Sequence, residues 1–230
     1  MSTAPDYLGR NRLAPEIIRI NSVNPETPLI AYAADQLRQG EVLGMPTDTF
    51  YGLAADPFNL RAVERVYDIK TRSRHKPLSL LIGSLNQAEA LAKDLPTEFY
   101  LLAEHFWPGP LTMIVQAAPG LPLKVTANSG NVALRVPAAN IPREVIRQAG
   151  VPITATSANL SGASECTSAA AVRDQLGERL NIIVDGGPSP REVPSTIVDL
   201  TVDEIGKPCW RIQREGAISA QEIAAALSGK

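Results

Sequence analysis

Residues 41–56 read EVLGMPTDTFYGLAAD. The first five form a short apolar strand, and the turn-rich loop from Pro46 onward follows it without a break. Thr47, Asp48 and Thr49 stand where this strand ends. Such short polar side chains either line a small-molecule site or cap the turn locally, as Thr and Asp do in ordinary loops. The stretch alone leaves both interpretations open.

Helices and short apolar strands alternate on both sides of this stretch. A helix over 28–39 precedes it, and Asn59 is placed as the N-cap of a helix over 60–70. Further helices are expected over 97–106, 142–149 and 168–176 and from Ser219, where Glu222 completes a capping box. Strands are expected over 78–82, 111–116, 132–136, 153–156, 181–184, 195–200 and 209–214. This alternation predicts an α/β fold, a twisted sheet covered by helices.

The composition of the 230 residues excludes several classes of protein. A net charge of −2, from 22 basic and 24 acidic residues, argues against a dedicated nucleic-acid binder. Two cysteines, Cys166 and Cys209, exclude a disulfide framework and a four-cysteine zinc site. No apolar run is long enough to span a membrane, and the N-terminus lacks a signal-peptide core, so we expect a cytoplasmic protein. We expect a loose extension over 1–24 and a single domain over 25–230.

A basic segment follows the loop. Residues 61–76 hold six basic side chains against Glu64 and Asp68. Basic groups just before a strand suit a polyanion such as a triphosphate. The alternatives are a solvated helix end, where cations complement the helix dipole, and an RNA-phosphate surface.

Two later loops and two arginines are also candidates. ITATSANLSG (153–162) and DGGPSPREVPSTIVDL (185–200) bring hydroxyls and an amide to strand ends, although both also suit plain turns. Arg135 interrupts an apolar strand, so its charge must be paired or face a site. Arg214 is a further candidate or a simple surface residue.

Taken in order, the segments PTDTFYGLAAD, Lys70-x-Arg72 with KPL behind it, WPGPLT, VALRVP, TSANLSG and Ser195-Thr196-Ile197 are similar to the YrdC-like domain of the threonylcarbamoyl-AMP synthase family. The resemblance covers roughly residues 25–220 and suggests the short, single-domain form. It implies a three-layer α/β fold around a twisted mixed sheet, with a basic concave cavity.

The resemblance also implies an activity. Members of this family join L-threonine, bicarbonate or CO₂, and ATP into threonylcarbamoyl-AMP and pyrophosphate for the t6A modification of tRNA. Mg²⁺ is the expected ion, and tRNA or the t6A-transferase machinery are candidate partners. The alternatives are an RNA-binding paralogue of the same fold without this activity, and a carbamoyltransferase domain of the hydrogenase-maturation type, whose zinc-finger and acylphosphatase segments are missing here.

The family's functional residues carry over by position. Lys70 and Arg72 are implied as catalytic, the threonine site takes Thr47, Arg135 and Ser195, and the ATP site takes Lys70, Arg72, Asn131, Ser157, Asn159 and Arg214. No metal ligand is assigned. Ser73 stands where many members have a proline, and Leu81 stands where some members carry a histidine. Because Lys70 ends a helix, we expect its removal to cost little stability. Lid candidates are the N-terminal extension and the loop over 186–194.

Overall fold

The computed structural model describes residues 14–201 and 209–228, and its strands form two mixed sheets. The first sheet has the order β1 (Glu16–Arg19), β9 (Ile182–Asp185), β2 (Leu43–Met45), β3 (Gly52–Ala54) and β8 (Thr156–Ser157). The second has the order β11 (Arg211–Arg214), β10 (Thr196–Asp199), β5 (Leu111–Gln116), β6 (Asn131–Arg135), β4 (Leu80–Leu81) and β7 (Ile153–Thr154). The predicted α/β class is confirmed, with the strands divided between two sheets.

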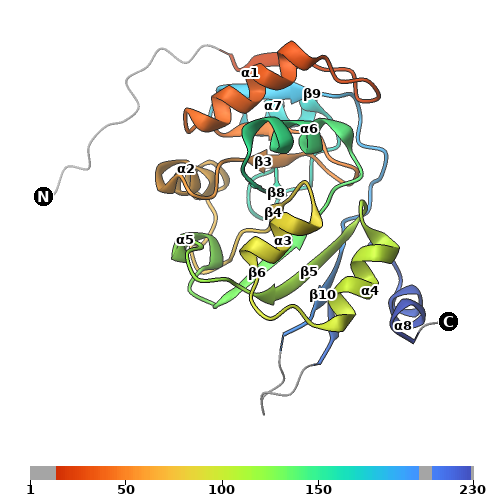
Figure 1. Cartoon of the computed structure of the whole chain (residues 1–230). Coiled ribbons are helices and arrows are strands. Elements are labelled where there is room, and N and C mark those ends of the chain that lie inside the picture. The colour runs from red at the N-terminus through yellow and green to blue at the C-terminus, as the bar shows by residue number, and fades with distance from the viewer. Residues whose placement is uncertain (1–13, 202–208, 229–230) are drawn as a thin grey trace, which may run out of the picture.

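Helices cover the faces of both sheets (Figure 1). Helices α1 (Thr27–Arg38) and α6 (Asn140–Ala149) lie together over the first sheet, and α7 (Ala169–Leu176) also packs on it. Figure 1 shows α3 (Leu85–Leu91) and α4 (Thr97–Phe106) beside the second sheet, and α4 contacts α8 (Ala220–Ser228). The remaining helices, α2 (Leu60–Lys70) and α5 (Leu123–Thr126), contact one another.

Strand β9 separates two apolar cores. Ile182 and Val184 pack into the core shared with α1 and α6, whereas Ile183 packs into the larger core that holds α2, α4 and α7. This division follows from the pleat, because successive side chains of a strand point to opposite faces. The apolar run that predicted this strand is therefore buried on both sides.

Two helices begin at the capping residues that the sequence predicted. The Asn59 side chain accepts hydrogen bonds from the backbone N–H groups of Arg61 and Ala62, so α2 begins behind it. The Ser219–Glu222 capping box forms in both directions, with N···O distances of 2.8 and 3.3 Å. Each cap satisfies N–H groups that the first turn of a helix leaves without partners.

The structure corrects the N-terminal expectation. Residues 16–19, within the segment expected to be a loose extension over 1–24, form β1 and pair in parallel with β9. The rest of that segment up to residue 13 lies outside the described residues. Strand β3 and helices α3 and α5 were not anticipated. Among the helices of the described residues, none combines the length and apolar character needed to cross a membrane.

Candidate functional site

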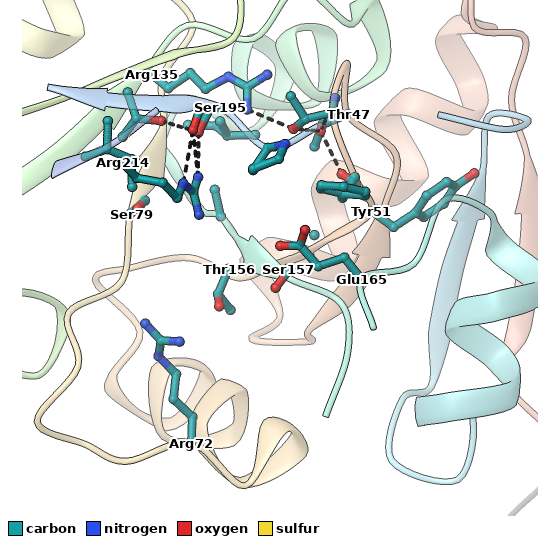
Figure 2. Close-up of a pocket in the computed structure, with 18 residues that line it drawn as sticks. Thr47, Tyr51, Arg72, Ser79, Arg135, Thr156, Ser157, Glu165, Ser195 and Arg214 are labelled. Atoms are coloured by element: carbon teal, nitrogen blue, oxygen red, sulfur yellow. Dashed lines mark hydrogen bonds between the residues drawn. The ribbon is translucent and has the colours of Figure 1, made fainter. Parts of the chain in front are cut away.

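A cavity of about 230 Å³ draws its wall from both sheets (Figure 2). The loop between β2 and β3 forms one side, β8 and the residues near it a second, and strands of the second sheet a third. Its lining comprises Thr47, Thr49, Phe50, Tyr51, Gly52, Arg72, Ser79, Leu81, Thr112, Arg135, Ala155, Thr156, Ser157, Glu165, Pro194, Ser195, Ile197 and Arg214. Six of the residues predicted for the ATP and threonine sites are in this set, which segments up to 167 positions apart bring together.

The Thr47 hydroxyl both caps its turn and lines the cavity. Its Oγ1 donates to the Phe50 carbonyl at 2.7 Å and lies 3.1 Å from Thr49 Oγ1. The Thr49 N–H in turn donates to Thr47 Oγ1 at 3.1 Å. Turn capping and site formation, the two interpretations of this loop, therefore apply to the same side chain.

Arg135 is buried and paired. Its Nη2 lies 2.6 Å from Asp48 Oδ1, Nε donates to the Gly109 carbonyl at 2.9 Å, and Nη1 donates to Thr49 Oγ1 at 3.0 Å. Burial lowers the pKa of Arg135, and the Asp48 carboxylate opposes that shift. The interrupted apolar strand thus contains a structural ion pair whose arginine also borders the cavity.

Ser195 and Arg214 form a second polar unit of the wall. Arg214 donates from Nη2 and Nε to the Ser195 carbonyl at 2.8 and 3.2 Å, and from Nη2 to Ser195 Oγ at 3.2 Å. The Ser195 hydroxyl also lies 2.9 Å from Thr112 Oγ1. Partial burial lowers the pKa of Arg214. These bonds fix β11 against the segment that leads into β10.

Lys70 lies behind the wall, and its exposed fraction is only 2%. Its ammonium donates to the carbonyls of Ser157 and Asn159 and, at 3.0 Å, to Asn159 Oδ1. The Ser157 hydroxyl donates to the same amide oxygen at 2.6 Å. All three ammonium protons are therefore used to hold the Ser157–Asn159 segment. The structure removes the basis of the expectation that losing a helix-end lysine costs little stability, because this lysine is buried and fully hydrogen-bonded.

Burial is also the main influence on the Lys70 ammonium. It lowers the pKa to about 8, with a further lowering from the Arg72 charge and an opposite effect of Glu165 and Cys166. A lysine with this pKa loses its proton within a unit or so of neutral pH, whereas an exposed lysine keeps its proton until the pH approaches its ordinary pKa of about 10.4.

Arg72 is the one member of the basic segment 61–76 that lines the cavity. It donates from Nη2 to the Pro77 carbonyl at 3.1 Å, and its buried Nε has no partner among the described residues. Arg74, by contrast, forms exposed ion pairs with Glu64 and Asp68. The segment is thus divided between a site residue, a buried lysine and a solvated face.

At two further positions the cavity lining differs from the site predicted from the sequence. Asn131, assigned to the ATP site, starts β6 four residues before Arg135 and is not part of the cavity lining. Glu165 does line the cavity, yet it lies in the loop between β8 and α7, whose sequence offered no signal for a carboxylate role. The fully buried Tyr51 also borders the cavity and donates to the Gly187 carbonyl at 2.6 Å, and burial raises its pKa to about 12.

The wall has the chemistry of an anion site. The lining holds three guanidinium groups, several hydroxyls and a single carboxylate, that of Glu165. One of the three guanidinium groups, that of Arg135, already pairs with the Asp48 carboxylate. Guanidinium groups bind carboxylates and phosphates through paired hydrogen bonds. The net basic character expected of the cavity stays a prediction. Within residues 14–201 and 209–228, no three His, Cys, Asp or Glu side chains gather as a metal site.

Comparison with known proteins agrees with this geometry. The Sua5/YciO/YrdC family model, described as "Telomere recombination", matches residues 35–216. The chain is 40% identical over 172 residues to the threonylcarbamoyl-AMP synthase of Pyrococcus abyssi, covering 75% of this chain and 51% of that protein. It is 38% identical over 208 residues to the Bacillus subtilis threonylcarbamoyl-AMP synthase, covering 90% and 59%.

A solved structure has the same fold. The crystal structure of P. abyssi Sua5 complexed with L-threonine superposes with a TM-score of 0.86 at 36% identity, over 92% of this chain and 60% of that one. The chain thus spans between half and three-fifths of the length of these relatives. The matched region includes the loop, the arginines and the serines that build the cavity wall, and on this evidence the chain belongs to the Sua5/YciO/YrdC family.

Proposed function

We propose that this chain is an L-threonylcarbamoyladenylate synthase, which condenses L-threonine, bicarbonate or CO₂, and ATP to threonylcarbamoyl-AMP and pyrophosphate. The observation that carries the proposal is the convergence of Thr47, Arg135, Ser195, Arg72, Ser157 and Arg214 on one cavity. The likeness to two threonylcarbamoyl-AMP synthases and to a Sua5 structure with L-threonine supports the same assignment.

The proposed reaction needs positioning and charge neutralisation more than a strong acid or base. The threonine amine forms a carbamate, and the carbamate oxygen attacks the α-phosphorus of ATP while pyrophosphate leaves. Arg135 and Ser195 would hold the amino acid, and Arg72, Ser157 and Arg214 would hold the nucleotide. Cations aimed at the phosphates stabilise the charge that builds up there during transfer.

Lys70 contributes to this scheme through the segment that it holds. Its ammonium protons are directed to Ser157 and Asn159. We therefore assign it a positioning role, with Arg72 as the cation of the Lys70-x-Arg72 pair that faces the phosphates.

Mg²⁺ would enter with ATP. Mg²⁺ in proteins usually keeps several waters and is bound through one or two carboxylates together with substrate phosphates. The described residues suit this mode, because a single carboxylate, Glu165, lines the cavity. Bound in this way, the ion would neutralise phosphate charge. We also propose that the product serves t6A modification of tRNA, with tRNA or the transferase machinery as its destination.

The test is a reconstitution with purified protein, ATP, Mg²⁺, bicarbonate and threonine, followed by mass detection of the acylated AMP. Pyrophosphate should form only when threonine and bicarbonate are both present, because the attacking carbamate requires both. Replacing threonine by serine, which lacks the methyl group, measures how much that group contributes to the rate of acylated AMP formation. Equal pyrophosphate release without threonine would exclude the proposed ligation, and salt-dependent RNA binding without ATP turnover would favour the RNA-binding paralogue.

A further inference from the structure

Glu165 is a carboxylate in a wall of cations. It lines the cavity with Arg72, Arg135 and Arg214, and Figure 2 shows its side chain directed into the open space. The residue is only partly exposed. Over the described ranges 14–201 and 209–228, its side chain takes part in none of the hydrogen bonds or ion pairs. The carboxylate is therefore directed into the cavity, without a protein partner, where a bound ligand can reach it.

The surroundings of Glu165 place it on the nucleotide side of the cavity. Its charge acts on the pKa values of Lys70 and Arg214, raising both, yet it forms an ion pair with neither. The charges that act on Arg135, at the threonine side, are those of Asp48, Arg214 and Arg191. Glu165 therefore shares the cavity wall with the residues proposed to hold ATP, and no ion pair among the described residues joins it to them.

This placement creates an electrostatic problem for free ATP. A triphosphate held by Arg72 and Arg214 would bring several negative charges close to the Glu165 carboxylate, and like charges at such distances repel. A divalent cation between the carboxylate and the phosphates removes the repulsion and links the two groups. Oxygen ligands of this kind are the ones that Mg²⁺ prefers.

We propose that Glu165 is the residue of this chain that ligates the Mg²⁺ carried by ATP, so that the site binds the metal–nucleotide complex in preference to free ATP. This inference rests on the proposed function. The hydroxyls of Thr156 and Ser157, which line the same part of the wall, are suited to hydrogen-bond the waters that Mg²⁺ retains.

Calorimetric titration of ATP into the wild type and Glu165→Gln, with and without Mg²⁺, tests the inference. With Mg²⁺, the variant should bind ATP about tenfold more weakly, on the scale of one lost charge-assisted contact. Without Mg²⁺, the variant should bind ATP roughly threefold more tightly than the wild type, because a repelling charge is gone. Glu178→Gln removes the same charge at an exposed position outside the lining and should change neither value.

Mn²⁺ serves as a spectroscopic probe that does not depend on turnover. The electron paramagnetic resonance signal of free Mn²⁺ should fall when wild-type protein is added to Mn²⁺ and ATP, and fall less with Glu165→Gln. Equal weakening of ATP binding with and without metal would overturn the inference and indicate a direct bond to the nucleotide, and 2′-deoxy-ATP would then identify the ribose hydroxyl as its donor. An unchanged variant would reduce Glu165 to a counter-charge for Lys70 and Arg214.

These outcomes separate the inference from the proposed function. A wild type that binds ATP neither with nor without Mg²⁺ contradicts the proposed function itself. A wild type that binds ATP and whose Glu165→Gln variant responds identically in both conditions contradicts only the metal-ligand role.

Discussion

The Lys70 ammonium lies 3.0 Å from Asn159 Oδ1, across 89 positions of sequence. The bond ties the end of α2 to the segment behind β8, and through the Ser157 hydroxyl it reaches the cavity wall. Lys70 thus acts on the site by fixing the residue in front of it.

Replacing Lys70 by methionine should lower both stability and nucleotide affinity. The change leaves the Asn159 amide oxygen and two carbonyls without this donor, and a buried acceptor without a partner costs about 1–3 kcal/mol. We expect a loss of that size in urea denaturation at pH 7, together with weaker ATP binding. Lys76→Met removes an exposed lysine of the same segment and is the control. Full stability in Lys70→Met would contradict the positioning role.

The contribution of Lys70 to stability should depend on pH. Burial lowers the pKa of Lys70 to about 8 in the folded protein, whereas an unfolded lysine titrates near 10.5. Between these values the unfolded state binds more protons than the folded state, so the free energy of unfolding rises with pH, by on the order of 3 kcal/mol across the window. The stability gap between wild type and Lys70→Met should therefore widen from pH 8 to 10. A constant gap would show that Lys70 keeps an ordinary pKa.

The Asp48–Arg135 pair should behave as a coupled unit. Removing one partner leaves a buried charge unpaired, at a cost of about 3–5 kcal/mol, so Arg135→Ala and Asp48→Ala should each destabilise the protein strongly. The double variant should lose less stability than the sum of the two, and denaturation of all four proteins measures the difference. Strict additivity would contradict the coupling.

Threonine recognition by Arg135 needs a variant other than Arg135→Ala, since Arg135→Ala is expected to be unstable. Arg135→Lys keeps the charge but cannot form the paired hydrogen bonds of a guanidinium. We expect threonine use to fall by roughly 10–150-fold in this variant, on the scale of a charge-assisted bond, with ATP affinity nearly unchanged. Threonine amide, which lacks the carboxylate, should lose little further activity. Equal losses for both substrates would give Arg135 a purely structural role.

Two arginines of β11 provide a matched comparison. Arg214 lines the cavity, whereas Arg211 pairs with Asp199 and its side chain is 68% exposed. Arg214→Ala should weaken ATP binding by at least tenfold, as expected for a lost contact to phosphate, and Arg211→Ala should leave it unchanged. Calorimetry of both variants decides whether the nucleotide reaches β11.

The sequence predicted elements whose signals are local. Helix α2 was placed at 60–70 because the Asn59 cap and an apolar stripe are both contained in the segment itself. Strand β1 was missed because its pairing with β9 joins residues 16–19 to 182–185, a relation that no local pattern contains. Strand β3 was missed because Gly52-Leu53-Ala54 has no β-branched residue and follows a loop.

The site was predictable to a similar extent. The motif order identified six residues that line the cavity, but side-chain direction decided the rest. Lys70 points back to Asn159, and Asn131 starts β6 at a distance from the lining. Neither the Asp48 partner of Arg135 nor the cavity-facing Glu165 follows from spacing, since both depend on how the two sheets meet.

The bonds from Arg214 to Ser195 make the cavity wall depend on a residue that is synthesised late. The ribosome delivers the Thr47 loop early, whereas β11 is the last strand in chain order among the described residues, so Arg214 is the last of the residues that line the cavity to be synthesised. A nascent chain that ends before Arg214 would carry most of the core without a complete site, and ligand binding should arise in a single step once β11 pairs with β10.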